Sequence, residues 1–257
     1  MRTRLPMPGN ASSPPPSRIG LVADAGVLRG SRVPLLALRR AGWGIAWMDE
    51  AAAETAGLSI GLIVPPGAPL LAAGAAEVWL RGDHTAAGVA DAVSRLRRLD
   101  APSRISVDVL DGDGLETAHR LGLTPVLGPA PLGELLALAA AGPADAAAGG
   151  LAVLLPISVG RTDAEARARL HRDPWLAALE ESGSVLVGTL EACQDAVISL
   201  AHAGVSDLRL RPAVTPDLPD VLAQLSALGR SPLDRLRPGA PRSPAPPAPA
   251  DWGGRPG

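Results

Sequence analysis

The chain has 257 residues, with 24 basic and 26 acidic side chains and one cysteine. This near balance of charge gives no sign of a basic surface and disfavours nucleic acids and anionic membranes as partners, and no apolar stretch is long enough to span a bilayer. The sequence contains neither Lys nor Tyr, which excludes Schiff-base chemistry, a Walker-type phosphate loop and reductases that use a phenolic proton donor.

Residues 1–17 are rich in proline and contain no apolar run. Proline at this density disfavours both a helix and a strand ladder, so we expect a disordered leader. The segment also lacks the apolar core of a secretory signal. We therefore expect a cytoplasmic protein.

Eight short apolar or β-branched runs follow, and each is typical of a buried parallel strand. They are residues 18–23, 44–48, 58–64, 77–80, 104–109, 124–127, 151–159 and 207–211. Helical patterns separate most of them: between residues 85 and 99, for example, Val89, Val93 and Leu96 recur on one face. Eight strands alternating with helices predict an α/β fold, a TIM-type (β/α)8 barrel that forms one domain over residues 18–230.

The connections between the second, third and fourth strands are too short for full helices. We therefore expect a compact barrel that is trimmed or degenerate relative to the ideal. Residues 231–257 are rich in Pro, Ala and Gly, and we expect them to form a disordered tail, with a partner-binding polyproline segment as the alternative.

Three motifs near the end of the barrel occur in a recognisable order. They are Val159 to Ala166 (VGRTDAEA), Val187 to Glu191 (VGTLE) and Ala203 to Leu208 (AGVSDL). This order resembles the C-terminal part of the bacterial luciferase-like, flavin-dependent monooxygenases. The resemblance implies an oxidoreductase that binds reduced FMN, or the deazaflavin F420, and uses O2 on a small organic substrate, with a flavin reductase as a partner.

In a barrel, ligands gather at the carboxyl ends of the strands. The helix start at Gly160, Arg161 and Thr162 is one candidate for the cofactor phosphate, because free N–H groups and the helix dipole favour an anion there. Arg161 adds a cation, so we expect the phosphate to depend on Arg161 more than on other late cations. The alternative is plain capping, since Thr162 and Glu165 form a capping box.

Two further positions are candidates for the same phosphate. Gly188 and Thr189 open the next helix without a cation, and Thr189 can equally be an ordinary cap. Arg81 follows the fourth strand and can hold a phosphate or a substrate carboxylate. The alternative for Arg81 is a solvated loop in which Asp83 pairs with it.

The candidates for the ring and substrate pocket follow the first, second and fourth strands, and they are Asp24, Trp47, Asp49, Glu50 and His84. Trp47 can stack on a flavin ring, or it can be a core residue. The family usually has a His after the second strand, where this chain has Glu50 and Ala51. A second hypothesis is therefore a catalytically inactive barrel that acts as a binding or scaffold protein.

A third hypothesis is metal-assisted hydrolysis, with Asp24, Asp49, Asp83, His84 and Asp108 as ligands. Only His84 supplies a nitrogen and the spacing follows no metal motif, so we expect no metal site. Residues 111–114 (DGDG) indicate a turn and a helix N-cap. Cys193 falls on an apolar helix face, which indicates a reduced core thiol.

Overall fold

Eight parallel strands pair around a closed ring in the computed structural model, which describes residues 18–23, 32–49, 58–65, 75–82, 85–98, 104–141 and 150–236. The strands of the ring are β1 (Arg18–Val22), β2 (Ile45–Met48), β3 (Ser59–Val64), β4 (Glu77–Leu80), β5 (Arg104–Asp108), β6 (Thr124–Leu127), β7 (Leu151–Gly160) and β9 (Val205–Pro212). Each pairs with the next along the chain, β7 pairs with β9, and β9 closes the ring on β1. The predicted TIM-type barrel is confirmed, and each of its eight strands matches a predicted run.

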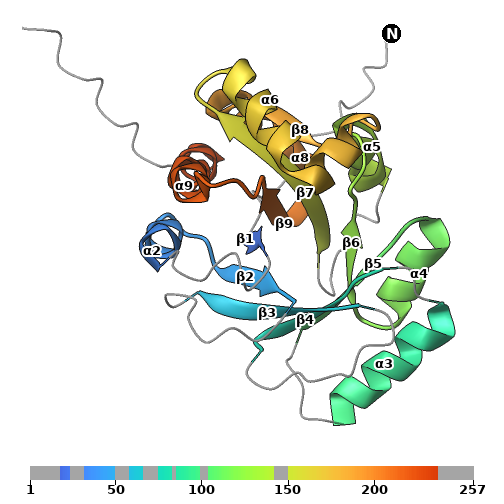
Figure 1. Ribbon diagram of the computed structural model, residues 1–257. Helices are drawn as coiled ribbons and strands as arrows, with labels where there is room; N and C mark the ends of the chain where they lie inside the picture. The colour runs from blue at the N-terminus through green and yellow to red at the C-terminus, as the bar shows by residue number, and fades with distance from the viewer. Residues whose placement is uncertain are drawn as a thin grey trace, which may run out of the picture.

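Helices surround this ring, as Figure 1 shows. Those in the described residues are α2 (Arg32–Arg40), α3 (Ala86–Arg98), α4 (Gly112–Arg120), α5 (Leu132–Ala141), α6 (Asp163–Arg172), α7 (Pro174–Glu180), α8 (Leu190–His202) and α9 (Leu218–Leu236). The face predicted for α3 is the buried one, with Val89, Ala92, Val93 and Leu96 turned toward the strands. None of the described helices is long and apolar enough to cross a membrane.

A short ninth strand, β8 (Leu186–Thr189), lies outside the ring. It pairs with residues 157–160, the last part of β7, which continues past its pairing with β6 at residues 152 and 153. In Figure 1 this end of β7 extends toward α6 and β8. The sequence pattern did not predict β8 as a strand, because four residues before a helix cap carry little periodic signal.

Two apolar clusters hold the barrel together. The larger lies between the strands and the surrounding helices, and includes Leu38, Leu96, Val197 and Leu225. The smaller fills the ring itself and includes Val22, Ile45, Trp47, Ile63, Trp79, Val126 and Leu154. Successive side chains of a strand point to opposite faces, so alternate residues of each strand pack into the larger and the smaller cluster.

The ends of the domain differ in one respect from the expectation. α9 runs to Leu236, past Arg230, where we expected the folded part to end. Pro232 predicts that a helix ends before it, but α9 continues through this position. The predicted leader, most of the predicted tail, and the connections at residues 50–57 and 66–74 lie outside the described residues.

Candidate functional site

The carboxyl ends of the strands form one rim of the barrel, where barrel proteins bind their ligands. Arg81 follows β4, Asp108 ends β5 and Arg211 lies near the end of β9, and all three are half-buried. Asp49, which follows β2, is exposed. The other predicted candidates for the ring pocket at this rim, Asp24, Glu50 and His84, lie outside the described residues.

Charged side chains close the opposite, amino-terminal end of the barrel. Arg18 of β1 forms ion pairs with Glu77 of β4 and Asp207 of β9, and Arg104 of β5 lies 3.7 Å from Asp207. Burial tends to raise the pKa of Asp207, but the surrounding guanidinium groups, that of Arg209 first, hold it below its usual range. Because barrel ligands bind at the other end, we assign this network to stability.

Arg209 of β9 fills the middle of the barrel. Its guanidinium carbon lies 3.8 Å from the ring centre of Trp47 and 4.6 Å from that of Trp79, and all three side chains are fully buried. Its Nη2 donates to Ser106 Oγ at 2.9 Å and to Asp207 at 3.3 Å. Burial lowers the pKa of Arg209 to about 10, so a positive charge persists between two indole rings at neutral pH.

Trp47 fits into the lumen because glycines flank it on both neighbouring strands. A Cβ atom at Gly61 would lie 2.3 Å from Trp47 Cε3, and one at Gly20 would lie 3.1 Å from Trp47 Nε1. Arg209 covers the ring. Trp47 is therefore a core residue, which is the alternative that we gave for it.

Asp108 connects the lumen to the rim. One of its carboxylate oxygens accepts a hydrogen bond from Trp79 Nε1 at 2.7 Å, and the other accepts one from the backbone N–H of Gly82 at 2.8 Å. Burial raises the pKa of Asp108, although these two hydrogen bonds and the charge of Arg81 oppose the rise. Trp79 and Gly82 flank Arg81 in the sequence, so Asp108 fixes the turn that carries Arg81.

Arg81 extends over the mouth of the barrel. Its guanidinium carbon lies 5.6 Å from the ring centre of Trp79 and 6.0 Å from that of Trp175 in α7. The backbone N–H of Arg81 donates to Val64 O at 2.9 Å, but within the described part of the chain its guanidinium donates no hydrogen bond and forms no ion pair. Arg211 is paired differently, because its Nη1 donates to Asp173 at 3.1 Å and its guanidinium covers Trp175 at 4.0 Å.

The two helix starts that are candidates for the phosphate site lie side by side. β7 and β8 pair so that Gly160 is opposite Thr189, with Gly188 one position earlier. Thr189 caps α8 by accepting a hydrogen bond from the N–H of Ala192 at 3.4 Å. A Cβ atom at Gly188 would lie 3.8 Å from Asp163 Oδ1, so a carboxylate is close to this pair of helix starts.

The residues of α6 itself satisfy much of its first turn. Thr162 Oγ1 accepts a hydrogen bond from the N–H of Glu165 at 3.2 Å, and the Glu165 carboxylate accepts one from the N–H of Arg161 at 2.8 Å. The predicted capping box is present, with its carboxylate bonded one residue earlier than usual. A Cβ atom at Gly160 would lie 2.5 Å from Ala166 N, so helix packing alone requires that glycine.

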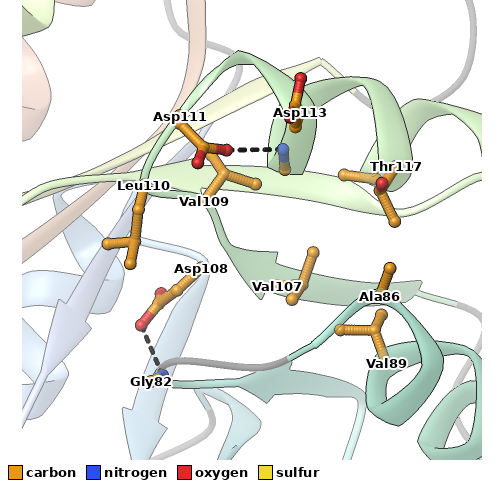
Figure 2. Close-up of a pocket in the computed structure, with 12 residues that line it drawn as sticks. Gly82, Ala86, Val89, Val107, Asp108, Val109, Leu110, Asp111, Asp113 and Thr117 are labelled. Carbon is orange, nitrogen blue, oxygen red and sulfur yellow. Dashed lines mark hydrogen bonds between the residues drawn. The ribbon is translucent and has the colours of Figure 1, made fainter.

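Beside the rim, a pocket of about 190 Å³ lies between the starts of α3 and α4, as Figure 2 shows. Its lining includes the apolar residues Val89 and Val107 and the acidic residues Asp108, Asp111 and Asp113. Asp111 is the predicted N-cap, and its Oδ1 accepts a hydrogen bond from the N–H of Gly114 at 2.8 Å. The acidic lining makes this pocket unsuitable for a phosphate.

Two other predictions concern reactive groups. Cys193 is fully buried, and burial raises the pKa of its thiol to about 12, which confirms the interpretation as a core residue. Among the described residues, no group of three His, Cys, Asp or Glu side chains is placed to hold a metal ion.

Sequence reasoning did not single out Arg209, Asp173 or Trp175. A usable signal exists for Arg209, because residues 207–211 (DLRLR) alternate charged and apolar side chains. In a closed barrel such alternation places one set inside the ring. Asp173 before Pro174 indicates a helix N-cap, but nothing in the sequence places α7 over the mouth.

No family model matches the chain, and no curated protein sequence matches it. Solved structures do match the fold. An F420-dependent secondary alcohol dehydrogenase, solved with an F420–acetone adduct, superposes with a TM-score of 0.60 and 12% identity over 82% of this chain and 98% of that one.

Two further structures are similar to the same degree. The coenzyme F420-dependent tetrahydromethanopterin reductase from Methanopyrus kandleri has a TM-score of 0.59 and 10% identity, over 82% of this chain and 97% of that one. The monooxygenase RslO1 from Streptomyces bottropensis has a TM-score of 0.57 and 14% identity, over 82% of this chain and 98% of that one. At these identities the likeness shows a shared fold.

Proposed function

We propose that this chain is an oxidoreductase that binds a reduced flavin, FMN or the deazaflavin F420, at the carboxyl-terminal rim of its barrel and acts on a small organic substrate. In the more specific form of the proposal it is a luciferase-like monooxygenase that uses O2 and receives reduced FMN from a separate reductase. The motifs between residues 159 and 208 support this proposal, as does a fold shared with two F420-dependent enzymes and a monooxygenase.

The observation on which the proposal depends most is the state of Arg81. This guanidinium is half-buried at the rim, and the described part of the chain offers it neither a hydrogen bond nor an ion pair. Among the described residues this cation has the Asp108 carboxylate and two indole rings as neighbours, and a phosphate or carboxylate from a ligand would add a direct ion pair. Both FMN and F420 carry a phosphate on a ribityl chain that is attached to a planar ring.

The lumen beneath Arg81 fits an anionic ligand in two ways. The buried charge of Arg209 lies below the rim with Trp79 between it and Arg81, so it adds to the positive charge of Arg81, while Asp207 and Asp108 offset part of both. The lumen is also filled at this level by Arg209, Trp47 and Trp79. This packing excludes water from the underside of a site at the mouth. A bound reduced flavin would supply the electrons for the reaction.

Arg81 fits the phosphate better than the predicted Arg161 does. The turn that carries Arg81 is fixed through Asp108, whereas Arg161 is exposed at a helix start whose residues include Asp163 and Glu165. A charge fixed at a partly buried position binds an anion more strongly than a mobile surface charge.

Fluorescence titration with FMN and with F420 tests the proposal. We expect the wild-type protein to bind at least one of them, and Arg81→Ala to bind it about tenfold to hundredfold more weakly, because one charge-assisted hydrogen bond contributes roughly 1.5–3 kcal/mol. Arg167→Ala is the matched control, since Arg167 is exposed on α6, and we expect it to bind as the wild type does.

Arg161→Ala completes the comparison. Weaker binding by Arg161→Ala, with Arg81→Ala unchanged, would place the phosphate at Gly160–Thr162 instead. If the wild-type protein binds neither cofactor, the proposal is wrong, and the barrel without a cofactor becomes the better hypothesis.

A further inference from the structure

Trp175 spans the mouth of the barrel. In the ring, β4 and β9 lie four strands apart in either direction, so they are on opposite sides. Arg81 follows β4, Arg211 belongs to β9, and both guanidinium groups lie over the Trp175 ring, at 6.0 Å and 4.0 Å from its centre. A side chain that meets cations from opposite sides of the ring lies above the lumen.

Asp173 holds Trp175 in this place. Its Oδ1 accepts hydrogen bonds from the backbone N–H groups of Trp175 at 3.0 Å and Leu176 at 3.1 Å. Its Oδ2 accepts one from Arg211 at 3.1 Å and one from the N–H of Val214 at 2.9 Å. This carboxylate is almost fully buried, so it joins the start of α7 rigidly to the end of β9.

Trp175 differs from the two tryptophans below it in one property that concerns a ligand. Trp47 and Trp79 have no exposed surface, whereas Trp175 is partly exposed. Arg81, its looser neighbour, has a long side chain that the described residues leave without a hydrogen bond. Arg211 is fixed on the Trp175 ring by Asp173, so a planar group arriving at the mouth would meet the exposed part of this ring on the side of Arg81.

We propose that Trp175, positioned by Asp173, is the stacking platform for a planar ring system whose anionic group pairs with Arg81. This inference rests on the proposed function, because a flavin or deazaflavin is the ring system that it takes. In this arrangement the anion and the ring bind to different residues, so the two contributions can be separated.

Riboflavin and FMN separate them, because riboflavin carries the ring without the phosphate. We expect Trp175→Leu to weaken the binding of both ligands about tenfold, the usual effect of losing one aromatic stacking partner. Arg81→Ala should weaken FMN binding and leave riboflavin binding nearly unchanged. Trp175→Phe should retain most of the affinity of the wild type, since its ring still stacks.

The role of Asp173 is tested by combining two changes. Asp173→Asn should weaken riboflavin binding several-fold in the wild-type protein and have no further effect in the Trp175→Leu background, since coupled residues do not add. A merely structural role would weaken binding in both backgrounds. Leu179→Ala, on the same helix, is the control for general damage to α7.

The outcomes distinguish the two proposals. If the wild-type protein binds FMN, and Trp175→Leu binds FMN and riboflavin as tightly as the wild type does, the platform is wrong and the proposed function stands. If the wild-type protein binds neither FMN, riboflavin nor F420, both proposals are wrong. Equal loss of affinity from Asp173→Asn with and without Trp175 would overturn the positioning role alone.

Discussion

Replacing Gly61 with Ala tests how tightly the column of Trp and Arg side chains is packed in the lumen. The new Cβ atom would lie 2.3, 2.6 and 2.7 Å from three ring atoms of Trp47, where ordinary contacts are about 3.5–4.0 Å. The ring has little room to move, because Arg209 lies 3.8 Å from its centre and Trp79 meets it edge-on at 5.8 Å. Overpacking a core costs about 1–3 kcal/mol. Because the Trp47 ring cannot move away, we expect Gly61→Ala to lower the free energy of unfolding by about 3 kcal/mol.

Calorimetry or urea unfolding measures the effect. For a domain of about 200 residues, each kcal/mol lowers Tm by roughly 2–4 °C, so we expect Gly61→Ala to lose roughly 6–12 °C. Gly44→Ala is the matched control, because its Cβ atom would meet nothing closer than Arg18 Cγ at 3.7 Å. Equal Tm values for the two variants would refute the packing argument.

Two further predictions concern buried groups. Asp207→Asn should lower the free energy of unfolding by about 3 kcal/mol, since it leaves buried guanidinium groups without their carboxylate, while Asp113→Asn, at an exposed position, should change it little. The pKa of Asp207 is depressed in the folded protein, so its contribution to stability is present above its unfolded pKa of about 3.9 and is lost as pH falls through the lower folded value. The difference in unfolding free energy between wild type and Asp207→Asn should therefore shrink below about pH 4. A difference that stays constant with pH would contradict the assignment. Cys193, whose thiol pKa burial raises to about 12, should resist a thiol reagent in the native protein and react fully in denaturant, and rapid native reaction would show that the helix face opens.

The strands were predictable because parallel strands buried on both faces have nearly continuous apolar sequences. Residues 124–127 and 77–80 illustrate this, since the predicted and observed bounds agree. β8 was not predictable in the same way, because four residues beside a helix cap satisfy no period, and only their pairing with the end of β7 makes them a strand. Tertiary contact decides such short segments.

The site was less predictable than the fold, for a different reason. The residues that follow each strand could be named from the sequence, and Arg81 was among them. Which of these residues meet depends on the stagger of the strands around the ring, which no single segment encodes. That stagger places Arg209 of β9 between Trp47 of β2 and Trp79 of β4, although the three are far apart in the chain.

Composition and site are connected through the filling of the lumen. The chain has no Phe or Tyr, so tryptophan is its only large ring, and glycines at positions 20 and 61 leave space that Trp47 occupies. The planar guanidinium of Arg209 packs against the indole ring of Trp47 in a cation–π contact. Its buried charge in turn requires Asp207.

The same alternation of ring and cation continues upward to the rim. Trp79 lies over Arg209, Arg81 lies over Trp79, and Trp175 follows. Below the rim, Arg18 pairs with Asp207, and Nη2 of Arg209 donates to Ser106 and Asp207. The described residues provide no hydrogen-bonding partner for the Arg81 guanidinium, so in the proposed function the cation at the end of this column pairs with the anionic group of the ligand.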